Sequence, residues 1–94
     1  MTDSRSIHIP ERFDFGHHKE FTEEVNTVIA DDSIKTLVLD FNRTSYLDSS
    51  ALGMLVLANK KAKERSMQTV IRGARDNAKE ILEIANFDKL FRIE

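Results

Sequence analysis

The sequence lacks cysteine altogether and has only one proline and three glycines among its 94 residues. The absence of cysteine excludes disulfides, cysteine-based zinc sites and thiol catalysis. No apolar run approaches the roughly 20 residues that a membrane-spanning helix needs. Neither sign of charge dominates, because 14 basic and 16 acidic side chains give a net charge of −2. This balance argues against a nucleic-acid-binding face and against a polybasic patch for a membrane surface.

The residues that are present are typical of a small globular domain, with 40% hydrophobic and 32% charged side chains. A chain of this length predicts a single domain, residues 1–94, with one modest core. The beginning of the chain, "MTDSRSIHIP", is polar and lacks the apolar centre of a signal peptide. We therefore expect a soluble, cytoplasmic protein.

Segments with strand and helix patterns alternate along the chain. Apolar residues at every second position predict a strand over 6–15, with Pro10 marking an edge position or a bulge. Further strands are expected within 34–41, 67–74 and 89–94, and helices over 16–32, 50–65 and 75–87, the last with Asp76 as its N-cap. Residues 42–50 are expected to form a loop. Such alternation indicates an α/β fold, with helices packed on a small, mainly parallel sheet of about four strands.

The segment "YLDSSALGML" (46–55) raises the main functional question. Asp48, Ser49 and Ser50 stand before an apolar run, and such residues cap helices well. No Glu or Gln follows at the position that a capping box requires. Two interpretations stay open at this point: the hydroxyls only cap the helix, or one of them has a function of its own.

The helix that follows has two different faces when residues 49–64 are projected at about 100° per residue. One face carries the small or apolar residues Ala51, Leu55, Ala58 and Ala62, flanked by Leu52 and Met54, and is expected to meet the sheet. The opposite face carries Ser49, Gly53, Val56 and Lys60, with Leu57 beside them. A glycine inside a helix costs about 1 kcal/mol relative to alanine. On an outward face it indicates that another chain approaches the backbone closely.

With these motifs in view, the sequence resembles the STAS domain family, in its branch of anti-sigma-factor antagonists. The resemblance rests on "LDSSALG" after a strand that ends in Asp40, and on "ANFDKLF" near the end of the chain. It extends from about Ile7 to Ile93. Ala51 stands where the family most often has glycine, and we expect the N-terminal strand and C-terminal helix of the family to be short or absent here.

The resemblance implies a partner switch. We expect no enzymatic activity, cofactor or metal site in this chain. Ser49 would be the site of reversible phosphorylation, with Ser50 the second choice. The unphosphorylated protein would bind an anti-sigma factor with serine-kinase activity, and a PP2C-type serine phosphatase would reverse the modification. The expected partner-binding residues are Asp48, Ser49, Ser50, Gly53, Val56, Leu57 and Lys60. We expect a monomer or weak dimer, with no direct contact to nucleic acid or membrane.

Other candidate residues have simpler interpretations. Asp48 is expected to cap the helix, or alternatively to hydrogen-bond the Ser49 hydroxyl. Asp40 is expected to fix the loop that leads to Ser49, or alternatively to help in contact with the partner. His17 and His18 are adjacent and would point about 100° apart on a helix, so they are expected to be surface residues rather than metal ligands. His8 is expected on the solvent face of its strand. No histidine base, nucleophile elbow or phosphate-binding loop accompanies Asp40 and Asp48, which argues against catalysis.

Two alternative functions belong to other classes. The chain could be a permanent STAS subunit of a transport or stress-sensing complex, in which the same helix face docks constitutively and the hydroxyls only cap. It could instead be a sensor of a small ligand or nucleotide, which ranks last because no convincing phosphate-binding loop is present.

Overall fold

The centre of the computed structural model, which describes residues 3–94, is a four-stranded parallel sheet. Its strands are β1 (Ser4–His8), β3 (Thr36–Asp40), β5 (Gln68–Arg72) and β6 (Arg92–Ile93), in the order β1-β3-β5-β6. All three pairings are parallel, as the alternation of strands and helices predicts. The predicted α/β fold with about four strands is therefore confirmed.

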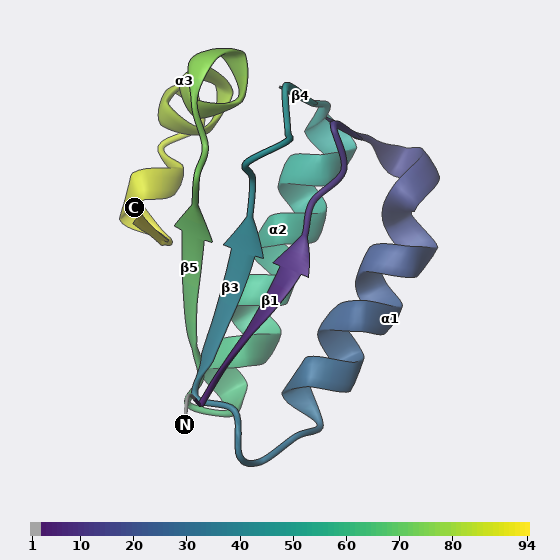
Figure 1. Cartoon of the computed structure of the whole chain (residues 1–94), viewed down its shortest axis with the longest axis vertical. Coiled ribbons are helices and arrows are strands. Elements are labelled where there is room, and N and C mark those ends of the chain that lie inside the picture. The colour runs from purple at the N-terminus through teal and green to yellow at the C-terminus, as the bar shows by residue number, and fades with distance from the viewer. Residues whose placement is uncertain (1–2) are drawn as a thin grey trace.

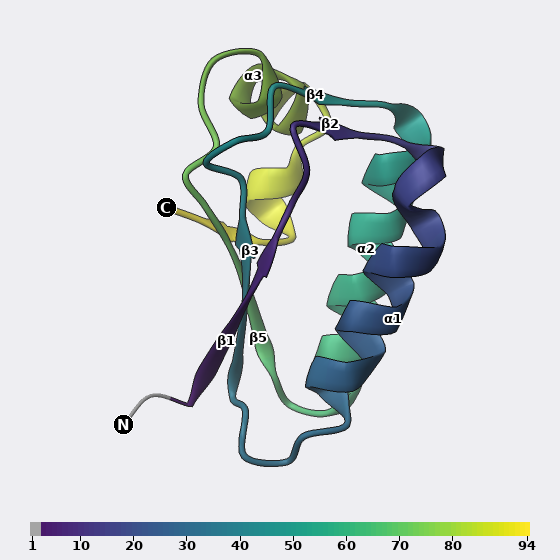
Figure 2. The same cartoon turned by 45° about the vertical axis from the view of Figure 1, so that its right-hand side comes forward.

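The two long helices lie on the same side of this sheet (Figures 1 and 2). They are α1 (His18–Ile29) and α2 (Ser49–Glu64). A shorter helix, α3 (Asp76–Ile84), lies beyond the carboxyl ends of the strands, close to β4 (Figure 1). Two 3₁₀ turns, η1 (Phe15–His17) and η2 (Phe87–Lys89), complete the helical elements of residues 3–94.

The core lies between the sheet and the two long helices. The spacing of helix α1 predicts one apolar stripe of Phe21, Val25, Val28 and Ile29. The first three are buried, and Ile29 is partly buried against the core. Helix α2 buries its predicted inner face, Ala51, Leu55, Ala58 and Ala62, to 2% exposure or less. These alanines have short side chains, so α2 can pack close to the central strands.

A second, two-stranded parallel sheet joins β2 (Arg12–Phe13) to β4 (Tyr46–Leu47). The sequence did not predict it: residues 6–15 were expected to be one strand, and 42–50 only a loop. The first expectation is wrong because the chain leaves the main sheet around Pro10, which has no N–H to donate. The Thr44 hydroxyl there donates to the carbonyls of Ile9 and Pro10, at 3.2 and 3.0 Å. This small sheet brings η1 next to the start of α2.

Helix α3 also begins differently from the prediction. Arg75, not Asp76, occupies the N-cap position, and its side chain makes no capping bond. Asp76 is the first helical residue and has a φ of +52°, in the left-handed region. A tight connection from β5 imposes this geometry, since Gly73 before it also has a positive φ of +82°. Aspartate tolerates such a backbone better than most residues.

Candidate partner-binding site at the start of helix α2

Asp48 is the residue that caps helix α2. Its backbone is extended, and its Oδ1 accepts a hydrogen bond from the Ala51 amide at 2.8 Å. Its other oxygen, Oδ2, accepts a longer bond from the Phe15 amide at 3.4 Å. One carboxylate therefore satisfies a free N–H of the first turn and also ties η1 to the beginning of α2.

The hydroxyls of Ser49 and Ser50 are left free by this arrangement. Both residues are exposed. Within residues 3–94, neither hydroxyl makes a hydrogen bond to another protein group, and Asp48 does not bond the Ser49 hydroxyl. The alternative role considered for Asp48, orienting that hydroxyl, is therefore not seen. Capping is assigned to the aspartate, and the serines stand at the helix start without a structural partner.

The predicted outward face of α2 is exposed along its length. An added Cβ at Gly53 would meet no atom within 4 Å, so the glycine is not needed for packing within residues 3–94. Val56 and Leu57 are 43% and 46% exposed, and Lys60 is exposed as well. The face thus presents a hydroxyl, bare helix backbone and two apolar side chains to solvent. An exposed apolar surface of this kind is typical of a docking site.

Phe15 is an additional exposed residue that the sequence pattern misplaced. The period-two pattern put it on a buried strand, whereas it lies in η1 with 66% of its surface exposed. Its ring stacks on His18, with centroids 5.5 Å apart. His18 in turn lines a small groove between α1 and α2 together with Leu57. The apolar surface therefore continues from α2 across to η1.

A turn signal could have placed Phe15 correctly. Asp14 stands two residues before Gly16, and its Oδ1 accepts a hydrogen bond from the Gly16 amide at 3.0 Å. Aspartate commonly makes this local turn with the amide two residues ahead. The turn ends the strand pattern before Phe15 and directs its ring outward.

Asp40 holds the start of the loop that leads to the site, as expected. Its Oδ1 accepts bonds from the Asn42 amide at 2.9 Å and from the Asn42 side chain at 2.7 Å. Its Oδ2 lies 3.2 Å from Nδ1 of His8. The hydrogen bond from the backbone N–H of Asn42 contributes most to lowering the pKa of Asp40 below its ordinary value. The carboxylate therefore stays charged and anchors the turn after β3.

Comparison with known proteins identifies the family. The chain matches the STAS domain over residues 3–94. It belongs to the STAS domain family. A STAS-domain containing protein of Pseudomonas aeruginosa (strain UCBPP-PA14) is 38% identical over 88 residues, which cover 94% of this chain and 85% of that protein.

Solved structures agree with this STAS fold. The anti-sigma factor antagonist SpoIIAA, in its unphosphorylated form, superposes with a TM-score of 0.74 and 14% identity, over 100% of this chain and 81% of its own. SpoIIAA, a Bacillus cell fate determinant, is also known in a phosphorylated form. A sulfate transporter family protein of Wolinella succinogenes superposes with a TM-score of 0.84 and 17% identity, over 97% of this chain and 75% of its own.

The remaining candidates in this STAS domain are surface groups. His8 is exposed, and His17 lies 3.3 Å from Asp14 whereas its neighbour His18 stacks on Phe15. No cluster of three or more potential metal ligands occurs within residues 3–94. In the same part of the chain, no helix has both the length and the apolar character to span a membrane.

Proposed function

We propose that this STAS domain is an anti-sigma-factor antagonist whose binding to its partner is controlled by phosphorylation of Ser49. The observation that carries the proposal is the exposed, unbonded Ser49 hydroxyl beside a cap that Asp48 already supplies. A kinase can reach that oxygen, and its modification removes no interaction of the fold. Ser50, also exposed, is the second choice.

The partner is proposed to be an anti-sigma factor with serine-kinase activity. It would dock on the outward face of α2, whose residues are Asp48, Ser49, Ser50, Gly53, Val56, Leu57 and Lys60, and on the neighbouring ring of Phe15. The likeness of fold to SpoIIAA, an anti-sigma factor antagonist that is known with and without phosphate, supports this assignment. A PP2C-type serine phosphatase would restore the binding form. Such a pathway operates in the cytoplasm, where we place the protein.

The physical basis of the switch is that the start of a helix accommodates a phosphate group, whereas a closely packed interface does not. Phosphate adds about −1.5 to −2 charges and three acceptor oxygens. The free N–H groups and dipole at the start of α2 tolerate negative charge, so the domain stays folded. A partner packed against Gly53 and Val56 would have to accept a bulky, charged group next to Asp48. If this costs the complex about 3 kcal/mol, the affinity falls roughly 150-fold.

A second candidate function is a STAS subunit that never switches. Its support is the likeness of fold to a sulfate transporter family protein, which superposes with a TM-score of 0.84. In that case the outward face of α2 would bind the rest of a transport or signalling complex permanently. Negative charge at Ser49 would then leave the assembly intact.

Calorimetry with a purified anti-sigma factor from the same cells separates these functions. We expect wild type and Ser49→Ala to bind, and Ser49→Asp to bind at least about 100-fold more weakly while keeping its circular dichroism spectrum. Ser45→Asp is the matched control, because Ser45 is also exposed but lies on the preceding loop. Equal binding by Ser49→Asp and Ser45→Asp would contradict the switch.

A further inference from the structure

Strand β1 forms an open edge of the main sheet. It pairs with β3 on one side, and within residues 3–94 no strand pairs with its other side. The Asp3 carbonyl accepts from the Thr36 amide at 3.3 Å, and the Ile9 amide donates to the Asp40 carbonyl at 2.9 Å. Since alternate residues of a parallel strand bond to the same neighbour, the backbone N–H and C=O groups of Ser4, Ser6 and His8 point away from β3.

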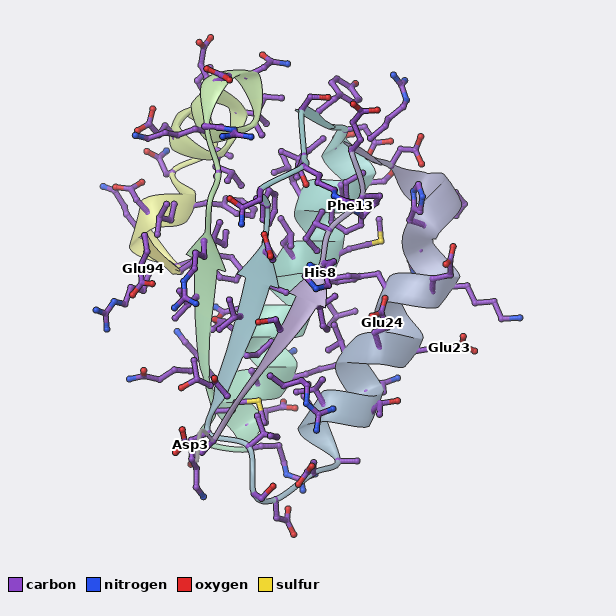
Figure 3. All side chains as sticks on the ribbon, in the orientation of Figure 1. Asp3, His8, Phe13, Glu23, Glu24 and Glu94 are labelled. Carbon is purple, nitrogen blue, oxygen red and sulfur yellow. The ribbon has the colours of Figure 1, made fainter. Side chains whose placement is uncertain are left out.

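A groove of about 360 Å³ lies between this edge and helix α1. Its lining consists of Arg5, Ser6 and Ile7 from β1 and of Glu20, Glu23, Glu24, Thr27 and Val28 from α1. Figure 3 shows His8 on the strand and Glu23 and Glu24 on the helix that border this region. The groove is therefore bordered on one side by the unpaired backbone of β1 and on the other by side chains of helix α1.

The charge of the groove is negative. Glu20, Glu23 and Glu24 are exposed and form no ion pair within residues 3–94. The one basic residue of the lining, Arg5, lies 3.7 Å from Asp31 and is partly compensated there. A ligand that fits the groove would carry positive charge.

We propose that this edge binds a short extended segment of a partner protein with lysine or arginine at alternate positions. The segment adds to β1 as a fifth strand and satisfies the outward backbone groups of Ser4, Ser6 and His8. Its basic side chains on the helix-facing side lie near Glu20, Glu23 and Glu24. This surface shares no residue with the Ser49 face, so the inference stands independently of the proposed switch.

A second copy of the same chain fits the edge less well. If two β1 strands paired across a two-fold axis, the same surface of each copy would meet, because a two-fold interface is self-complementary. The α1 helices of both copies would then bring their Glu20, Glu23 and Glu24 carboxylates towards one another. Like charges facing each other oppose this dimer, whereas they attract a basic segment.

Nuclear magnetic resonance titration with a synthetic probe tests the proposal. The probe is a capped seven-residue peptide of alternating lysine and threonine, and its control replaces each lysine by glutamate. We expect the lysine peptide to shift the amide signals of Ser4, Ser6 and His8 and to slow their hydrogen exchange. We expect the glutamate peptide to leave these signals unchanged.

Two sets of variants make the test decisive. Ser6→Pro removes an outward N–H without touching the bonds to β3 and should weaken peptide binding about tenfold, whereas Ser6→Thr should not. Glu20→Lys with Glu24→Lys, which alters only exposed side chains, should also abolish binding, and Ser49→Asp should leave it unchanged. The proposal is overturned if the lysine peptide leaves the amide signals of Ser4, Ser6 and His8 unshifted. It is also overturned if the Ser6→Pro variant and the variant with Glu20→Lys and Glu24→Lys both bind the lysine peptide as wild type does, or if β1 pairs with a second copy of the chain instead.

Discussion

At the scale of single residues, Asp48 and Ser49 divide two roles between neighbouring side chains. The aspartate satisfies the Ala51 amide and holds Phe15, whereas the serine hydroxyl is exposed and unbonded within residues 3–94. This division allows Ser49 to be modified without unfolding the helix end. It also means that mutations at Asp48 and at Ser49 should change the free energy of unfolding by different amounts.

We expect Asp48→Ala to lower the free energy of unfolding by about 1 kcal/mol, the usual cost of losing a side-chain N-cap. Ser49→Ala should change it by less than about 0.5 kcal/mol, as is usual for an exposed side chain without special contacts. Urea denaturation of both variants beside wild type measures the difference. A loss at Ser49 as large as that at Asp48 would mean that the serine does belong to the cap.

Asp40 gives a pH dependence whose direction follows from its hydrogen bonds. The hydrogen bond from the backbone N–H of Asn42 is the main cause that lowers the pKa of Asp40 in the folded state below its unfolded value of about 3.9. Its contribution to stability is therefore present above pH ~4 and is lost as the pH falls through the lower, folded-state pKa. Denaturation from pH 7 to pH 2 should show Asp40→Asn less stable than wild type at pH 7, with the gap closing in acid. Asp88→Asn, at an exposed residue, is the control.

At the scale of elements, helix α2 carries a glycine that the fold does not require. Gly53→Ala places a methyl group in open space and should raise the free energy of unfolding by about 0.5–1 kcal/mol. If a partner packs against this backbone, the same variant should bind it more weakly. Denaturation and calorimetry on one preparation test both effects. Unchanged affinity would show that the partner does not approach Gly53.

A buried polar pair joins α2 to β5. The Thr69 hydroxyl donates to Oδ1 of Asn59 at 2.6 Å, and both residues are at least 93% buried. Thr69→Val leaves the Asn59 oxygen without its donor and should destabilise the domain by about 1–3 kcal/mol. Thr69→Ser keeps the hydroxyl and serves as the control, so thermal unfolding should rank it closer to wild type. Equal losses would assign the effect to packing rather than to the hydrogen bond.

The elements also show what the sequence could and could not predict. The inner face of helix α2 follows local periodicity, and its residues Ala51, Leu55, Ala58 and Ala62 are buried as predicted. Helix α1 and strands β3 and β5 were predicted as elements at about the positions now seen. The short β2–β4 sheet was missed because two-residue strands carry no pattern and form only through a contact between distant segments. Phe15 was misplaced for a different, local reason: a turn made by Asp14 interrupts an alternating pattern that otherwise continues through Phe15. The exposure of Ser49 and the outward face of α2 were predicted correctly, whereas their use by a partner stays a prediction.

At the scale of the whole molecule, the domain presents two surfaces that do not overlap. One is the start and outward face of α2, joined to Phe15, and the other is the acidic groove along β1. The core of residues 3–94 lies between them, between the sheet and helices α1 and α2 (Figure 2). Because the two surfaces share no residue, the domain could lose a partner at one of them through a local charge and still keep its fold and its other surface.

Site-resolved mass spectrometry of the protein isolated from its own cells tests the central claim most directly. Wild type and Ser49→Ala are compared under two conditions, one in which the proposed partner switch is inactive and one in which it is active. We predict one phosphate on Ser49 of the wild type, whose occupancy changes with the condition, and no phosphate on Ser49→Ala. Phosphate found at another residue, with equal occupancy in both proteins, would contradict the account.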